Sequence, residues 1–262
     1  MSPSVLTEPM ETIRVDDDGG VRIITMNRPE ALNAINSAMI DELTDAYQAA
    51  AEDQSIKVVV LTGEGRAFSA GADLKAMGGP PKQSRHELVD MLHAIIDLPQ
   101  PLIAAVNGLG AGYGATICGL ADMTVMAEDA RIKAPFSALG LTAELASTYN
   151  FPRLMGPQKA MWFLLSSDWM SASECFDVGL ALEVCASDLL DQRVMARASH
   201  LATMPRASLV MTKRLMVDAH RDAMKEAVAR EGEGLNQLGG GPANVEAIAA
   251  FKDRRDPDFT GM

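Results

Sequence analysis

Two glycine-bearing loops, about forty residues apart, have the residue types needed to hold negative charge on an oxygen atom. The first covers residues 66–74, RAFSAGADL, and the second covers residues 106–114, VNGLGAGYG. Each loop follows an apolar, strand-like run and leads toward a helical pattern, so its backbone N–H groups lack intrahelical acceptors. Two such donors aimed at one oxygen form an oxyanion hole, which stabilises charge that develops on a carbonyl oxygen.

A carboxylate beside such a hole can move protons, and Glu144 is the candidate. Its sequence neighbours Leu141, Leu145 and Phe151 are apolar, so burial is expected to favour the neutral form and raise the pKa of Glu144. A structural role is also open. Thr142 can cap a helix whose first turn contains Glu144, where a negative charge complements the helix dipole. The two roles are compatible.

The loops have two further interpretations. Gly71, Gly112 and Gly114 can simply permit tight turns. Residues 110–115, GAGYGA, also match the G-x-G-x-x-A pattern of dinucleotide-binding domains, with Asp129 downstream. Such a domain ordinarily opens with this motif after its first strand, whereas here a hairpin, a helix and another strand come first. The match is therefore a weak signal.

The elements expected around the loops alternate between strands and helices. Residues 12–15 and 21–26 predict a β-hairpin around the run DDDGG, and a helix capped by Ser37 reaches about residue 53. The remaining expected elements are strands over 57–62, 102–106 and 122–126, and helices over 84–96, after Gly112, and over 157–165, 171–178, 186–204, 208–219 and 244–254. This alternation predicts a largely parallel sheet and an α/β fold.

Composition and charge exclude several classes of protein. Of the 262 residues, 48% are hydrophobic and 22% are charged, so a substantial core can form without disulfides. The net charge of −12 disfavours nucleic acid or an anionic membrane as a partner. Neither a membrane-spanning run nor a secretion signal is evident, and Cys118, Cys175 and Cys185 suit a reducing compartment. A cytoplasmic location is expected.

A metal centre is not expected from the sequence. His86 and His93 are seven residues apart and can share a helical face. No further His, Cys or carboxylate group supplies a third and a fourth ligand at suitable spacing.

An ordered set of motifs carries a family resemblance. After the hairpin come NRP at 27–29, ALNA at 31–34, AFSAGADL at 67–74 and VNG at 106–108, and FPRLMG follows at 151–156. This set resembles the crotonase family, the enoyl-CoA hydratase and isomerase superfamily, over roughly residues 12–255.

The resemblance implies a spiral of β-β-α units and acyl-CoA thioesters as ligands. The chain is expected to divide into a flexible N-terminus at residues 1–11, a spiral core at 12–200 and a helical region at 201–262, and the resemblance implies that the helical region makes the contacts of a homotrimer or hexamer. No separate cofactor is expected, because coenzyme A is part of the substrate. The backbone amides of Ala72 and Tyr113 would bind the thioester oxygen. The family usually has glycine where Tyr113 stands, so the tyrosine side chain could reshape the acyl pocket.

The same resemblance disfavours a hydratase. Hydratases of the family use two glutamates, and the matching positions hold Thr116 and Phe136, neither of which transfers a proton under ordinary conditions. Residues 134–152 look instead like the delta-3, delta-2-enoyl-CoA isomerases, whose single catalytic glutamate matches Glu144. That base would take a proton from carbon 2 of a 3-enoyl-CoA and return it to carbon 4.

Other predicted contacts with the ligand depend on the resemblance alone. The thioester and pantetheine path is expected along Ala70, Gly71 and Leu74, while Asp73 is expected to orient the first loop. Candidate partners for the CoA phosphates are Lys75, Arg28 and Lys213, while Lys252 is expected to reach the ligand of a neighbouring subunit from the C-terminal helix; each is also a typical solvated surface charge.

The sequence is also compatible with two alternatives to the isomerase. One is another acyl-CoA enzyme of the superfamily, either a hydratase or a dehalogenase-type hydrolase with a carboxylate nucleophile. The latter needs aromatic residues around a substrate ring, and the chain has only 5% aromatic residues. The other is a non-catalytic acyl-CoA binder, which predicts a Glu144 side chain far from the Ala72 and Tyr113 amides.

Overall fold

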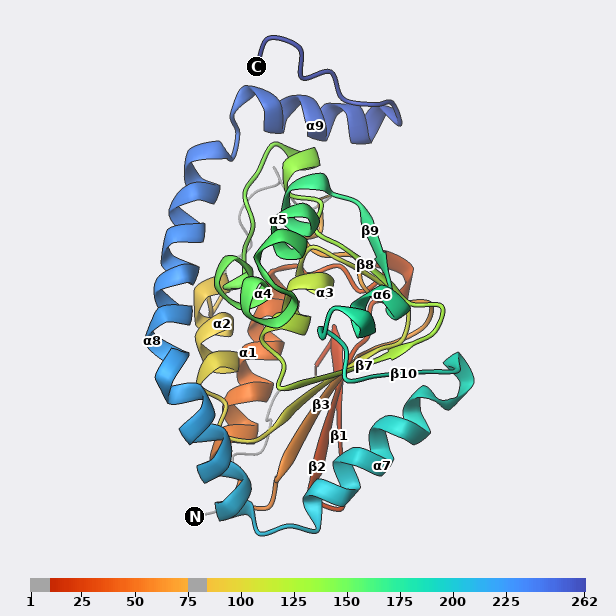
Figure 1. Cartoon of the computed structure of the whole chain (residues 1–262), viewed down its shortest axis with the longest axis vertical. Helices are drawn as coiled ribbons and strands as arrows, with labels where there is room; N and C mark the ends of the chain where they lie inside the picture. Colours follow the sequence, from red (N-terminus) through yellow and green to blue (C-terminus); the bar gives the residue numbers. More distant parts are fainter. Residues whose placement is uncertain (1–9, 75–83) are drawn as a thin grey trace.

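The computed structural model describes residues 10–74 and 84–262 (Figure 1). The predicted flexible N-terminus, residues 1–11, lies outside the described residues except for Met10 and Glu11, and Lys75 also lies outside them. The division into a spiral core at 12–200 and a helical region at 201–262 stays a prediction.

Over the described residues, the larger sheet has six strands in the order β1-β2-β3-β5-β7-β10. Their bounds are β1 Ile13–Asp18, β2 Val21–Met26, β3 Val58–Gly63, β5 Leu102–Val106, β7 Met123–Ala127 and β10 Glu183–Cys185. The hairpin β1–β2 is antiparallel, and all the other pairs are parallel. β3 and β5 are almost entirely buried, as expected for strands covered on both faces.

A second, smaller sheet was not expected from the sequence. In the described part of the chain it has the order β4-β6-β8-β9, with β4 Ala67–Ser69, β6 Leu109–Ala111, β8 Arg131–Lys133 and β9 Trp169–Ser171. Each turn of the chain therefore puts one strand in each sheet: β3 then β4, β5 then β6, β7 then β8. The result is the spiral of β-β-α units, and the chain has the mixed α/β crotonase fold.

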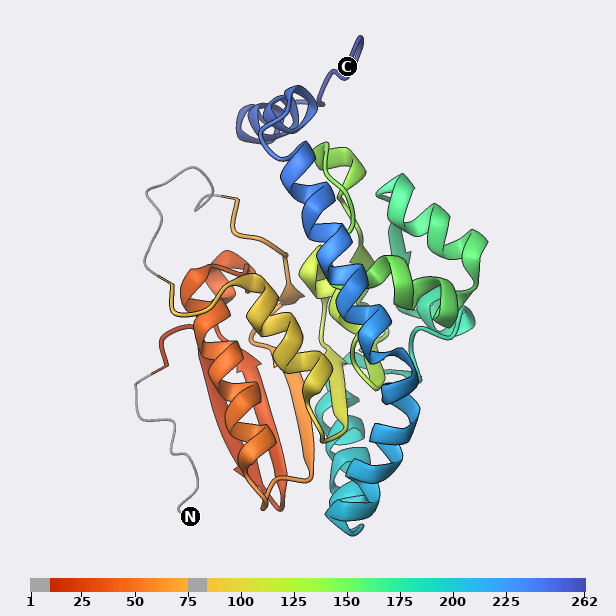
Figure 2. The ribbon, with the colours of Figure 1, turned by 90° about the vertical axis from the view of Figure 1, so that its left-hand side faces the viewer.

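Helices cover both faces of the larger sheet. Their bounds are α1 Ser37–Glu52, α2 Leu88–Asp97, α3 Tyr113–Thr116, α4 Ser147–Met155, α5 Pro157–Ser166, α6 Ala172–Asp177, α7 Leu190–Ala202, α8 Arg206–Leu238 and α9 Pro242–Asp253. Figure 2 shows α1 and α2 side by side, with α8 running past α2. α7 packs on β2, β3, β5 and β7. No helix in the described ranges has both the length and the apolar character needed to cross a membrane.

Three helix predictions need correction. Asn36, not Ser37, caps α1, because its side chain accepts a hydrogen bond from the Met39 amide. α2 begins at Leu88 rather than residue 84. The helix expected over 208–219 is part of the 33-residue α8, whose second half buries a narrow stripe of residues that continues to Glu231.

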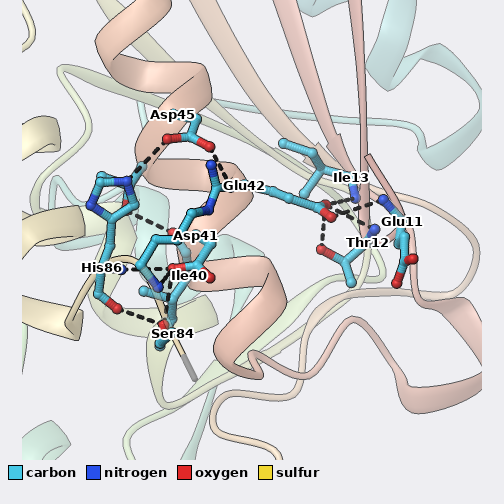
Figure 3. A network of polar contacts seen from close by, with 11 residues as sticks. Glu11, Thr12, Ile13, Ile40, Asp41, Glu42, Asp45, Ser84 and His86 are labelled. Carbon is cyan, nitrogen blue, oxygen red and sulfur yellow. Dashed lines mark hydrogen bonds and ion pairs between the residues drawn. The ribbon is translucent and has the colours of Figure 1, made fainter. Parts of the chain in front are cut away.

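Two adjacent carboxylates on α1 fix neighbouring segments of the chain (Figure 3). Glu42 accepts the backbone amides of residues 11–13 at 2.8 to 3.0 Å, which holds the start of β1. Asp41 accepts the Ser84 hydroxyl and the amides of Arg85 and His86 at 2.8 to 2.9 Å, which holds the residues that lead into α2. α1 is thus an anchor for both segments.

Candidate active site

The two glycine-bearing loops lie side by side because they follow neighbouring parallel strands, β4 and β6. A Cβ atom added to Gly71 would lie only 3.4 Å from the Gly112 Cα and 2.8 Å from the Ala111 carbonyl oxygen. Both glycines have positive φ, +83° at Gly71 and +52° at Gly112, a region that other residues rarely adopt. Glycine is therefore required at both positions for the loops to meet.

The backbone amide of Ala72 points away from the segment around Ile35, with which the first loop pairs. The Ile35 amide donates to the Gly71 carbonyl at 2.8 Å, and the Asp73 amide donates to the Ile35 carbonyl at 2.9 Å. Because successive amides in an extended chain point to opposite sides, the Ala72 N–H faces away from Ile35. Among the described residues it has no acceptor.

The Tyr113 amide is the first of α3. The carbonyl of Gly112 accepts the amides of Ala115 and Thr116 at 2.9 Å, and the Gly112 amide donates to the Lys133 carbonyl at 3.0 Å. The Tyr113 amide itself has no acceptor within residues 10–74 and 84–262, as is usual for the first turn of a helix. Among the residues that the structure describes, each of the two loops thus presents one amide without a partner in the protein.

The Tyr113 side chain is buried in the protein core. Only 2% of the residue is exposed, and its phenol lies beside that of the fully buried Tyr47. Burial raises the pKa of both phenols, and their hydroxyls interact without the geometry of a full hydrogen bond. Tyrosine is therefore compatible with this loop, because its ring packs inward while its backbone amide remains available. Its predicted effect on the acyl pocket stays a prediction.

Glu144 lies beside the second loop. Its Oε1 atom is 4.0 Å from the point where a Cβ on Gly112 would be. Burial, followed by the negative charge of Glu231, raises the pKa of Glu144 from 4.5 to about 7. At neutral pH the side chain can therefore exist as a carboxylate and as a carboxylic acid, as proton transfer in both directions requires.

The alternative role for Glu144 in helix capping is wrong. α4 begins at Ser147, and the preceding residues Leu145 and Ala146 have left-handed backbones with φ of +60° and +51°. Glu144 therefore precedes the helix rather than lying in its first turn, and Thr142 is not the N-cap.

The residues that hold this segment were missed by the sequence analysis. They come from α8 and α9, which are about a hundred residues away along the chain. A Cβ on Gly234 would lie 2.8 Å from the Thr142 Cγ2, and the Asn244 side chain donates to the Leu139 carbonyl at 2.8 Å. The only sequence signal was the helical spacing of apolar residues over 224–228, which places residue 231 on the same face.

The two positions that match the hydratase acids carry no acid. The Thr116 hydroxyl is buried and donates to the Gly112 carbonyl at 3.0 Å, while Phe136 is buried with 5% exposure. Within the described residues, no cluster of three or more His, Cys, Asp or Glu side chains could hold a metal ion.

The first loop is anchored by an ion pair. Arg28 donates to Asp73 at 3.0 Å and to the Ala34 carbonyl at 2.6 Å, with both charged side chains largely buried. The Ala70 amide donates to the Leu32 carbonyl at 2.9 Å. This geometry gives Arg28 and Asp73 a structural role. The predicted contact of Arg28 with a CoA phosphate stays a prediction, as do the pantetheine contacts of Ala70, Gly71 and Leu74.

The contacts of Lys213 place it away from the loops, and the predicted reach of Lys252 to a neighbouring subunit's ligand stays a prediction. Lys213 donates to Asp122 at 2.6 Å and to the Gln100 carbonyl at 2.9 Å, at the end of the larger sheet where strands β5 and β7 begin. The chain passes from the larger sheet into the smaller sheet and the loops at the opposite ends of these strands. Burial lowers the pKa of Lys213, although the charge of Asp122 opposes this effect. Lys252 is exposed in the last turn of α9.

The two-sheet spiral, with paired loops at the ends of neighbouring strands, defines the class of the protein as a crotonase-fold enzyme. The model of the family described as Enoyl-CoA hydratase/isomerase matches residues 16–262. The chain therefore belongs to the enoyl-CoA hydratase/isomerase family, whose members are acyl-CoA enzymes.

Individual relatives agree on the family and differ in their reactions. The chain is 35% identical to a probable enoyl-CoA hydratase of Rhodobacter capsulatus, over 95% of this chain and 98% of the relative. It is 34% identical to the human enoyl-CoA delta isomerase 2, over 84% of this chain and 58% of the relative. The structure of an enoyl-CoA hydratase/isomerase from Pseudoalteromonas atlantica superposes with a TM-score of 0.92 at 30% identity, covering 95% of this chain and 100% of that one. Family membership alone does not choose between hydration and isomerisation.

Proposed function

We propose that this protein is an enoyl-CoA isomerase that moves a double bond from position 3 to position 2 through a thioester enolate. Glu144 is the single base, and the amides of Ala72 and Tyr113 hold the thioester oxygen. The observation that carries the proposal is the place of the Glu144 carboxylate beside Gly112, the residue that precedes Tyr113 in the second loop.

The reaction needs one group that accepts a proton and then returns it. The Glu144 carboxylate takes a proton from carbon 2, and the electron pair moves toward the thioester oxygen, giving a dienolate. Hydrogen bonds from Ala72 and Tyr113 stabilise that negative charge, and each such donor is typically worth about 10² to 10³ in rate. The Glu144 carboxylic acid then delivers the proton to carbon 4, which leaves the double bond between carbons 2 and 3.

The pKa of Glu144 suits both halves of this cycle. A carboxyl group with a pKa of about 7 is a stronger base than an ordinary glutamate and still ionises at neutral pH. Water addition instead needs a group that activates water and another that delivers a proton. Thr116 and Phe136 supply neither, and this supports isomerisation over hydration.

The test is to incubate the purified protein with 3-hexenoyl-CoA and to follow conjugation of the double bond by absorbance. Wild type should isomerise the substrate, and Glu144→Gln should be slower by about 10² to 10⁴. Equal rates in both would remove Glu144 as the base. Hydration of 2-hexenoyl-CoA at a comparable rate would instead favour the hydratase, and binding of the thioester without turnover would favour a non-catalytic binder.

We also propose that the protein is a homotrimer, alone or paired into a hexamer, as the family resemblance implies. Exposed apolar side chains on α8, within the region expected to make these contacts, support an association surface: Leu215 and Met216 are 72% and 70% exposed. Sedimentation velocity at micromolar concentration would test this, and a monomer would contradict it.

A further inference from the structure

The turn that carries Glu144 has an unfavourable backbone. Leu145 and Ala146 are consecutive residues with left-handed φ angles, and neither is a glycine, asparagine or aspartate. In such a conformation the Cβ atom lies too close to the following carbonyl oxygen, so the surrounding structure must hold the turn in place. Ala146, at the N-cap position of α4, has no side chain that can do so.

Glu231 of α8 supplies the missing acceptor. Its Oε2 atom accepts the Ala146 amide at 2.7 Å, and its Oε1 atom accepts the Thr148 amide at 2.9 Å and the Thr148 hydroxyl at 2.6 Å. These amides lie at the start of α4, where backbone donors lack intrahelical partners and a negative charge is favourable. A side chain more than eighty residues away therefore caps the helix that follows the base.

The packing of α8 makes this contact rigid. Glu231 is 5% exposed and lies on the same face as the buried residues Met224, Ala227 and Val228. One turn later, Gly234 permits close approach of α8 to Thr142. The segment that carries Glu144 is thus held by α8 both before and after the base.

The two glutamates also interact through charge. Burial is the larger cause of the raised pKa of Glu144, and the charge of Glu231 is the second. Burial also raises the pKa of Glu231, whereas its hydrogen bonds from Thr148 and Ala146 and the charge of Arg230 act in the opposite direction. Because all three contacts to Glu231 are donors, the ionised carboxylate satisfies them best.

We propose that Glu231 is a positioning residue for Glu144: by holding the amides of Ala146 and Thr148, it fixes the turn that aims the base at the acyl carbon. This inference rests on the proposed function. It assigns to the C-terminal helix a part in proton transfer, although Glu231 itself does not touch the substrate.

The principal variant is Glu231→Gln, which removes the charge and turns one acceptor into a donor that faces a backbone or hydroxyl donor. Its matched control is Glu233→Gln, an exposed position on the same helix. We expect kcat to fall by about 10- to 100-fold with Glu231→Gln, because a small displacement of the base is costly, while KM changes little. The acid limb of the kcat/KM profile should move to lower pH, since a nearby negative charge is lost. The control should match wild type in both respects.

Thr148→Val provides a second variant that keeps both backbone contacts. It removes only the hydroxyl donor, so it should lower kcat in the same direction and by less, even if Glu231→Gln does not fold. Wild-type kcat and an unshifted acid limb in both variants would overturn the proposal.

A titration of Glu144 separates this proposal from the proposed reaction. In protein labelled with ¹³C at the glutamate carboxyls, the signal absent from Glu144→Gln belongs to Glu144. Its midpoint should lie at lower pH in Glu231→Gln than in wild type and the Glu233→Gln control. Coincident midpoints would refute the coupling even if the isomerase is active, and a shifted midpoint would support it even if 3-hexenoyl-CoA is not a substrate.

Discussion

The ionisation of Glu144 should be visible in the pH dependence of isomerisation. An ordinary glutamate has a pKa of 4.5, and the partly buried Glu144 has a pKa of about 7. Only the carboxylate can take the proton from carbon 2. The rate at limiting substrate should therefore follow the ionised fraction of this one group in the free enzyme.

The size of the effect follows from the titration of a single group. With a pKa of about 7, the ionised fraction is roughly one tenth at pH 6, one half at pH 7 and nine tenths at pH 8. kcat/KM should therefore rise about tenfold between pH 6 and pH 8 and then level off. With the ordinary pKa, the same interval would show almost no change.

The assay is the initial rate of conjugation of 3-hexenoyl-CoA at substrate concentrations well below KM, in buffers of constant ionic strength. Glu144→Asp is the informative companion, because it keeps a carboxylate but withdraws it by one methylene. It should be slower than wild type at every pH and retain an acid limb. A flat wild-type profile from pH 6 to pH 8 would refute the claim that a partly buried carboxylate with a raised pKa does the chemistry.

Three further outcomes follow from the same contacts. The raised pKa of Glu144 means that the folded protein disfavours its charged form, so the wild type loses folding stability as the pH rises from 4.5 toward 7. In urea unfolding, Glu144→Gln should therefore be more stable than wild type at pH 8 by about 1–3 kcal/mol. The two proteins should be equally stable at pH 4. Gly112→Ala places a side chain at φ +52°, so it should lower kcat/KM by at least about tenfold and the free energy of unfolding by about 1–2 kcal/mol. The control Gly232→Ala has open space around its added Cβ and should be neutral or stabilising. Equal behaviour of the two variants would contradict the strain argument. Arg28→Ala removes the ion pair with Asp73 and the hydrogen bond to the Ala34 carbonyl, and it should lower urea stability by about 1–3 kcal/mol; an unchanged midpoint would show that Arg28 does not anchor the loop.

Local patterns predicted most of the elements. The hairpin β1–β2 and the strand β5 could be predicted because their periodicity and turn residues are local properties of the chain. The smaller sheet was not predicted because its strands are three residues long, which is too short to show an alternation of apolar and polar residues. The full length of α8 was not predicted because its second half buries only a narrow stripe of residues between charged ones.

The sequence by itself determined the chemical groups of the candidate site: two glycine-bearing loops, one carboxylate among apolar neighbours, and no acid at positions 116 and 136. Those identities are fixed by residue type and spacing, which are local. Only the tertiary structure decided that Arg28 pairs with Asp73 and that Lys213 lies where strands β5 and β7 begin, at the opposite end from the loops. It also decided that Glu231 accepts hydrogen bonds from the turn that follows Glu144. Such contacts join residues far apart in the chain, so they exist only once the spiral and α8 have packed.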